Sequence, residues 1–302
     1  MNGDFRTYAL PSTQDSTETV QQNLSEISHR QQPLHLARAF HLGELIGELS
    51  PAELPGRDTL LSVYERLFLQ TPQDDAYTMA TRLADLVTLC KELASAYPDH
   101  YDTVFFELFG QHALPTPDAQ GRVAYVQNSY TEQAFMELTG FIKQRRVAYF
   151  HHFDDVCQEV RGGLCEYGIL PVESTAEGLM AGLFRLISRY DLRICSLCRI
   201  ATAGDSHTAF ALVRKSLPPI RPQQPYCLDF LCTPSDEGEI GELIGVSSLC
   251  GHTLLHASTY QNQDSDTFRL RMQVLPESLY PFLLYLLLFC ADITPIGFYL
   301  IK

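Results

Sequence analysis

Basic residues are scarce in this chain. Its 302 residues include 22 Lys and Arg against 36 Asp and Glu, which gives a formal net charge of −14. A nucleic-acid-binding surface requires a basic face, so this composition argues against a nucleic-acid partner. Long apolar runs are also missing, because the longest, Leu279–Cys290, contains Pro281 and is too short to cross a bilayer. We therefore expect no membrane partner either.

Targeting, metal and nucleotide signals are equally sparse. The first 18 residues contain no basic segment followed by an apolar run, so we expect no signal peptide. Nine cysteines without a disulfide-framework spacing indicate a reducing, cytoplasmic location. Cys195 and Cys198 form a lone Cys-x-x-Cys pair, and Cys227 with Cys232 is a poor second pair, so we interpret all four as core residues and predict no metal site. No Gly-rich phosphate motif is present, and we predict no cofactor.

The charge that is present is unevenly distributed. Residues 17–116 hold six basic against fourteen acidic side chains, residues 121–217 hold eleven against ten, and residues 218–302 hold four against nine. An anionic small molecule would therefore meet the least repulsion in the middle segment. Apolar residues make up 45% of the chain, which is enough for packed cores.

Hydrophobic periodicity divides the chain into parts. Residues 1–16 read as a disordered tail, and residues 17–116 show the i, i+3, i+4 spacing of helices. Residues 121–217 alternate short strands with helices, which favours a mainly parallel sheet. After a Pro-rich linker, residues 222–302 read as βαββαβ, a ferredoxin-like order. The predicted fold class is a multidomain α and α/β protein.

The middle segment carries the most specific motifs. Tyr130-Thr131-Glu132 follows a strand at Arg122–Tyr125, and Pro171-Val172-Glu173-Ser174-Thr175 is followed by Gly178. Together with Asp205–Phe210 these stretches resemble, in order, the motifs of prephenate dehydratases, including Pro-x-Glu-Asn-Ser-x-x-Gly. The resemblance implies a dehydratase-like site at Glu173, Ser174, Thr175 and the catalytic-threonine position Thr208. The Arg that follows this threonine in the family, and that would fix a substrate carboxylate, is Ala209 here.

The flanking segments fit fused members of the same family. Arg38, followed by Leu42 and Ile46, and the pair Arg57-Asp58 resemble chorismate mutase helices, so the resemblance implies mutase-like roles for Arg38, Arg57 and Asp58. The C-terminal segment resembles an ACT domain, which binds amino acids at paired interfaces. Its family signatures fall on Gly241–Ile244 and Ala257–Tyr260, which implies an effector site at Gly241, Leu243 and Ser258.

Two features indicate loss of activity. Mutase chemistry requires several cations around a dicarboxylate, and three of the expected positions are occupied by other residues. Dehydratase chemistry requires a proton donor in a water-poor cleft between two lobes. Only Ala201–His207 separates two predicted strands where the second lobe would be inserted, and at about 3.3 Å per residue this stretch makes only a turn. A purely structural interpretation also stands, in which Ser174 and Thr175 cap a helix that begins at Ala176.

Three functions remain open from the sequence. The first is a catalytically impaired, regulatory prephenate dehydratase-like protein of phenylalanine biosynthesis, dimeric and able to bind prephenate, chorismate or phenylalanine. The second is a working dehydratase, or a working mutase, that a partner subunit completes. The third is an amino-acid-binding ACT module outside this pathway.

Overall fold

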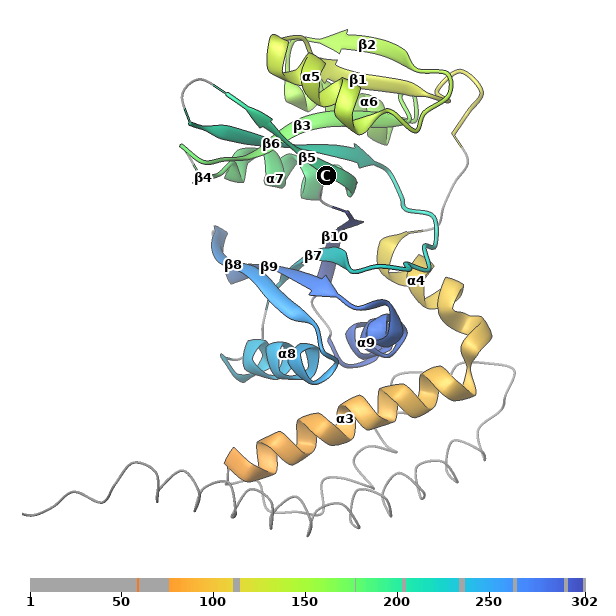
Figure 1. Ribbon diagram of the computed structural model, residues 1–302, viewed down its shortest axis with the longest axis vertical. Helices are drawn as coiled ribbons and strands as arrows, with labels where there is room; N and C mark the ends of the chain where they lie inside the picture. Colours follow the sequence, from red (N-terminus) through yellow and green to blue (C-terminus); the bar gives the residue numbers. More distant parts are fainter. Residues whose placement is uncertain are drawn as a thin grey trace, which may run out of the picture.

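The computed structural model describes residues 76–110, 115–176, 178–202, 205–233, 237–262, 265–290 and 293–300, together with residue 59. Arg38, Arg57 and Asp58, with the helices predicted before residue 76, lie outside this part of the chain. The described residues are built around one mixed ten-stranded sheet (Figure 1). Its strand order is β2-β1-β3-β6-β5-β10-β7-β9-β8, with β4 beside β3. The prediction of a mixed α/β fold is thus confirmed.

Parallel strands form one end of the sheet. Strand β1 (Arg122–Val126) pairs in parallel with β2 (Arg146–Phe150) and with β3 (Tyr167–Ser174). Helices α5 (Ser129–Leu138) and α6 (Phe153–Arg161) make the crossovers between these strands. Helix α5 begins where it does because the Asn128 side chain accepts hydrogen bonds from the backbone N–H groups of Tyr130 and Thr131.

The next two strands are antiparallel. Strands β5 (Arg193–Ala201) and β6 (His207–Arg214) form a hairpin, and β6 also pairs antiparallel with β3. The expectation of a mainly parallel sheet was therefore wrong for this half of the segment. A connection this short can join only antiparallel neighbours, because a parallel crossover needs a dozen or more residues.

The chain also turns back at the end of β3. Strand β4 (Gly178–Leu179) pairs antiparallel with β3, and helix α7 (Ala181–Arg189) begins only after it. The prediction that Ser174 and Thr175 cap a helix starting at Ala176 was wrong. Gly178 has φ +74°, a conformation suited to glycine, and this lets the chain fold back after β3. Met180 is then the N-cap of α7.

The C-terminal part has the order β7 (Tyr226–Cys232), α8 (Glu237–Leu249), β8 (Thr253–Asn262), β9 (Ser265–Val274), α9 (Pro276–Phe289) and β10 (Ile293–Tyr299). Strand β7 pairs antiparallel with β9 and with β10, and β8 pairs antiparallel with β9. Strand β10 then meets β5 in parallel at Gly297 and Ile194, which joins the two halves of the sheet.

Helices cover the C-terminal strands on one face. Helix α3 (Ala76–Ala96) runs below α8 and α9, and α4 (Tyr101–Phe109) follows the short helix η1 (Pro98–His100) (Figure 1). Leu89, Leu93 and Phe105 are fully buried in the resulting core. The other face of the C-terminal strands looks toward α7 and the middle segment (Figure 1). None of the described helices is long and apolar enough to cross a membrane.

Candidate functional site at the end of β3

The four predicted dehydratase-like residues lie where β3 ends and β6 begins. Ser174 pairs with Thr208 in the ladder, and Glu173 pairs with Ala209. Ser174 is buried and Thr208 is half-buried. The carboxyl ends of β1 and β2 lie at the same edge because both strands run parallel to β3. The fold thus brings Glu173, Ser174, Thr175 and Thr208 together at one edge of the sheet.

Local hydrogen bonds fix this edge. The Thr175 N–H donates to the His207 carbonyl over 2.9 Å, and the His207 N–H donates to the Thr175 hydroxyl over 2.9 Å. Ser174 Oγ accepts a bond from the Ala176 N–H over 3.2 Å. The hydroxyls of Ser174 and Thr175 therefore hold backbone groups in place. Neither Ser174 nor Thr175 needs a ligand to be satisfied.

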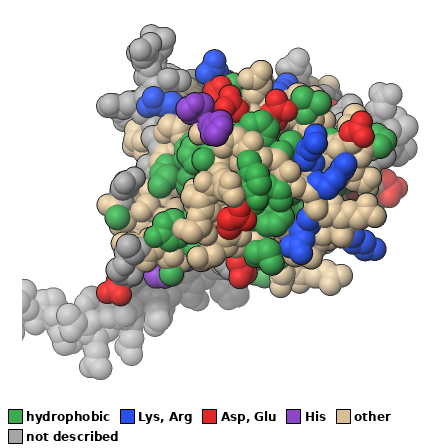
Figure 2. Space-filling view, turned by 90° about the horizontal axis from the view of Figure 1, so that it is seen from above, with side chains coloured by type: hydrophobic (Ala, Val, Ile, Leu, Met, Phe, Trp, Pro, Cys, Tyr) green, Lys and Arg blue, Asp and Glu red, His purple; other side chains and the backbone are tan. Residues whose placement is uncertain are grey.

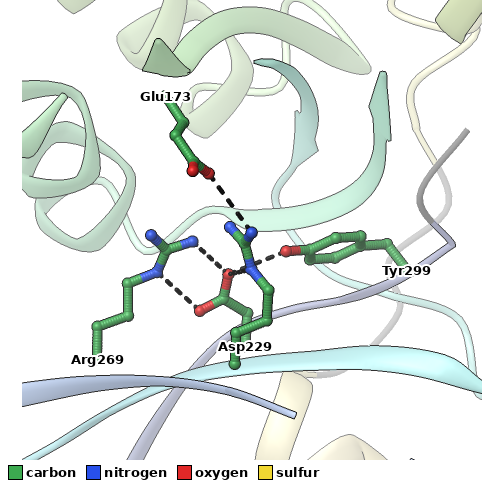
Figure 3. Close-up of polar contacts among 5 residues, drawn as sticks. Glu173, Asp229, Arg269 and Tyr299 are labelled. Carbon is green, nitrogen blue, oxygen red and sulfur yellow. Dashed lines mark hydrogen bonds and ion pairs between the residues drawn. The ribbon is translucent and has the colours of Figure 1, made fainter. Parts of the chain in front are cut away.

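A buried ionic cluster joins this edge to the C-terminal strands. Asp229 on β7 lies between Arg269 and Arg271 on β9, and all three are buried (Figure 3). Arg269 donates to the Asp229 carboxylate through Nε over 2.9 Å and Nη2 over 2.6 Å. The Nε of Arg271 donates over 3.2 Å, and the Tyr299 hydroxyl donates over 2.9 Å. One carboxylate thus accepts four hydrogen bonds.

The electrostatics of the cluster keep its charges in place. Burial alone would raise the pKa of Asp229, but Arg269, Arg271 and the Tyr299 hydroxyl together hold this pKa below its ordinary value. Burial and the Asp229 carboxylate raise the pKa of Tyr299 well above its ordinary value. Asp229 is therefore ionised and Tyr299 is neutral, which is the combination that the hydrogen bonds require.

Arg271 extends the cluster to the predicted site. Its Nη1 lies 3.5 Å from Glu173 Oε2, and the side chain of Glu173 is 39% exposed against 7% for Arg271. Glu173 is thus the solvent-facing partner of a buried cation. The Arg269 guanidinium lies 3.9 Å from the centre of the Phe184 ring on α7, which fills the adjoining space.

The cluster is not fully satisfied by protein groups. Arg269 Nη1, Arg271 Nη2 and Ser258 Oγ are buried and make no hydrogen bond to another described residue. Ser258 on β8 pairs with Arg269 on β9, so the two side chains lie on the same face of the sheet. Buried donors and acceptors are usually paired with protein or ordered water, so these three atoms are points at which a further hydrogen-bonding group would be satisfied.

The predicted effector residues are placed apart. Leu243 is buried in the core below the sheet, packed with residues such as Leu270. Ser258 lies on the opposite face, beside Arg269. Gly241 is exposed on α8, and a side chain there would meet nothing within 4 Å. The three residues do not converge on one point within the described chain.

Asp229, Arg269, Arg271 and Tyr299 were missed by the sequence reasoning. The signal was available in Tyr226–Cys232, where Asp229 is a single carboxylate inside an otherwise apolar strand. Arg269 and Arg271 alternate with Leu270 and Met272, which places both cations on one face of a strand. A lone buried charge requires a partner, and alternating arginines on a neighbouring strand would supply it.

Other surfaces carry weaker signals. Figure 2 looks onto the end of the molecule near β2, where apolar side chains lie among groups of both charges and Lys and Arg gather on one side. Exposed apolar residues of this segment include Met136, Phe141 and Tyr149. Cys198 is buried and Cys195 is half-buried, and the Cys195 thiol donates to the Leu212 carbonyl. Among the described residues, no group of His, Cys, Asp or Glu has the arrangement of a metal site.

Comparison with known proteins bears on this geometry. Residues 126–202 match the prephenate dehydratase family model. This segment is prephenate dehydratase-like. The match runs from the last residue of β1 to the residue after β5, and it includes Glu173, Ser174 and Thr175 but ends before Thr208. No curated protein matches the chain.

Solved structures extend the prephenate dehydratase likeness at the level of fold. Prephenate dehydratase from Streptococcus mutans has 16% identity and a TM-score of 0.50, covering 60% of this chain and 98% of that one. GqqA, described as a novel type of quorum quenching acylase, has 18% identity and a TM-score of 0.48 over 60% of this chain and 95% of its own. Prephenate dehydratase from Arthrobacter aurescens, in complex with L-Phe, has 14% identity and a TM-score of 0.49 over 59% and 89%.

Proposed function

We propose that this chain is a catalytically impaired, regulatory prephenate dehydratase-like protein of phenylalanine biosynthesis. It binds prephenate or a related carboxylate at the edge formed by Glu173, Ser174 and Thr208. The family match over residues 126–202 supports the choice of ligand. The edge itself offers hydroxyl groups for hydrogen bonding, and a carboxylate ligand there would also need a cation.

The β5–β6 hairpin is the observation that supports the proposed loss of catalytic activity. Ala201 pairs with His207, and the Thr202 N–H donates to the Ser206 carbonyl over 2.8 Å, so the chain returns at once from β5 to β6. A dehydration needs groups on both sides of its substrate and a site that excludes water. Within the described chain, no second lobe is inserted between β5 and β6. A ligand bound at the Thr208 edge therefore stays exposed to water.

The regulatory role is proposed from the C-terminal strands. Their βαββαβ order with the strand order β10-β7-β9-β8 is the plan of an ACT-like domain. Arg271 brings this unit into contact with Glu173. We propose that the C-terminal unit senses an aromatic amino acid and that the N-terminal helices are a mutase-like remnant. The mutase-like roles of Arg38, Arg57 and Asp58 remain predictions.

Turnover measurements test the proposal directly. We expect the purified protein, incubated with prephenate, to form phenylpyruvate no faster than a buffer blank, while prephenate still raises its melting temperature. The same assay with chorismate tests the mutase-like part. The family resemblance assigns Thr208 to the catalytic-threonine position. Turnover above the blank that disappears in Thr208→Ala would therefore overturn the proposed loss of activity.

A completed enzyme is the second candidate, favoured by one observation. Strand β8 lies at an edge of the sheet, and its residues Thr253–Ala257 are exposed. Two copies of the chain that pair there would form a homodimer, and a partner copy that also reached the Thr208 edge could supply missing groups. A turnover rate per molecule that rises with protein concentration would support this second function over the first.

A further inference from the structure

The candidate ligand is a carboxylate, but the four predicted residues of the edge that would bind it include no cation. Glu173, Ser174, Thr175 and Thr208 supply one negative charge and three hydroxyls. Position 209, directly across the ladder from Glu173, is alanine. Ala209 is buried with Val172 and Phe184, so it projects to the face on which the C-terminal strands pack. Arg199 on β5 pairs with Ala209 from its other side and is exposed, whereas the cation that contacts Glu173 itself comes from the C-terminal strands.

Arg271 reaches this edge from the C-terminal sheet. Its guanidinium is held on one side by Asp229 through Nε, and its Nη1 contacts Glu173, the residue opposite Ala209. Its Nη2 is buried without a hydrogen-bond partner among the described residues. Asp229 already accepts two hydrogen bonds from Arg269. Arg271 is thus oriented by one carboxylate, loosely engaged by a second, and keeps a free donor.

We propose that Arg271 is the ligand-binding cation of the candidate site, supplied by the C-terminal sheet in place of a side chain at position 209. This inference rests on the proposed function. A ligand carboxylate displaces Glu173, accepts from Nη1 and Nη2 together, and satisfies the unpartnered nitrogen in the two-pronged geometry that arginine provides. Glu173 is the exposed partner, and it competes with the ligand for the same cation.

Binding of matched probes tests the assignment. Phenylpyruvate and phenylacetone share their aromatic and ketone groups, but only phenylpyruvate has a carboxylate; prephenate serves as a third probe. Calorimetry on the full chain should give measurable binding of prephenate and phenylpyruvate and none of phenylacetone. Arg271→Met should weaken carboxylate binding by about tenfold or more, because a hydrogen bond to a charged group is lost.

Two further variants keep the test decisive. Arg189→Met removes an arginine of neighbouring α7 that is 72% exposed, and it should bind as the wild type does. Glu173→Gln removes the competing charge and leaves the contacts of Asp229 with Arg269, Arg271 and Tyr299 in place, so it should bind phenylpyruvate several-fold more tightly. Arg271→Lys retains charge but loses the fork, and its affinity should fall between those of wild type and Arg271→Met.

The outcomes separate this inference from the proposed function. A folded Arg271→Met that binds carboxylates like wild type, or a Glu173→Gln that binds them more weakly, overturns the role of Arg271 and leaves the proposed function standing. A wild-type protein that binds none of the carboxylates overturns both. If Arg271→Met does not fold, Glu173→Gln and Arg271→Lys decide the question by the same criteria.

Discussion

At the scale of single residues, a buried titratable side chain determines a response to pH. His252 follows α8, and its ring packs edge-on against Phe282 at 4.8 Å between centroids. The Leu275 N–H donates to His252 Nδ1 over 3.2 Å, so Nδ1 must carry a lone pair and the ring must be neutral. Burial lowers the pKa of His252 from 6.5 to about 4.

This lowered pKa predicts a loss of stability in mild acid. Above pH 6.5 the ring is neutral whether the chain is folded or not. Between pH 6.5 and 4 the unfolded chain binds a proton that the folded chain does not, so the free energy of unfolding falls as the pH falls. The total loss is about 3 kcal/mol by pH 4. Urea unfolding at pH 7.0, 6.0 and 5.0 measures how the free energy of unfolding falls with pH.

A matched pair of variants assigns the effect to His252. The amide oxygen of His252→Asn can accept the Leu275 N–H without titrating, so this variant should lose most of the slope. His151→Asn, at an exposed position, should keep it. An unchanged slope in His252→Asn would show that other groups dominate the acid response.

The individual site residues differ in how well the sequence predicted them. Glu173, Ser174 and Thr175 stand in one short motif, so their proximity was available from local spacing, whereas the antiparallel pairing of Ser174 with Thr208 was not predicted. Asp229 and Arg271 are separated by 42 positions, and Arg271 and Glu173 by 98. Contacts over such separations depend on which strands become neighbours, which no local pattern specifies.

At the scale of elements, one close approach joins the two halves of the sheet. Strand β10 pairs with β5 at Gly297 and Ile194. A Cβ at position 297 would lie 2.7 Å from Ile194 Cβ and 2.8 Å from the Ile194 carbonyl oxygen. The strands can approach this closely only because residue 297 has no side chain.

Gly297→Ala should therefore destabilise the protein by about 1–3 kcal/mol, since the added methyl group must push two backbones apart. Gly182→Ala is the matched control, because a Cβ at that position of α7 meets nothing within 4 Å and alanine favours a helix. Thermal melts of both variants make the comparison. Equal melting temperatures for Gly297→Ala and wild type would mean that the junction yields without cost.

Elements were predicted well where the local signal was strong and poorly where neighbours decided. Helices Phe153–Arg161 and Tyr101–Phe109 are each followed directly by a glycine, Gly162 or Gly110, which marks their ends in the sequence. The direction of β6 and the short β4 were missed. Strand β4 depends on the turn at Gly178, and the direction of β6 depends on the hairpin that closes between Ala201 and His207; small and polar residues of this kind occur both in turns and at helix starts.

At the scale of the whole molecule, the described parts share their cores. One apolar cluster includes residues of α3, α4, α8, α9 and the inner face of the C-terminal strands. A second cluster contains Phe184 of α7 and Val172 of β3 together with Cys227 and Tyr299 of the C-terminal strands. The C-terminal unit is therefore packed on both faces, and Arg271 joins it to the Glu173 edge.

The outer edge of this sheet predicts self-association. Strand β8 ends the strand order, and Leu254 and Leu255 on it are 37% and 45% exposed. An exposed strand edge with apolar side chains invites pairing with another strand, and a second copy offers the same edge in the antiparallel orientation that a twofold axis requires.

Light scattering should give a mass near twice 34.1 kDa. Leu255→Lys should weaken the dimer about tenfold or more by placing a charge at the edge, whereas Leu164→Lys, at a residue 58% exposed on the middle segment, should not. A monomeric wild type at all concentrations would remove β8 as the contact and the second candidate function with it.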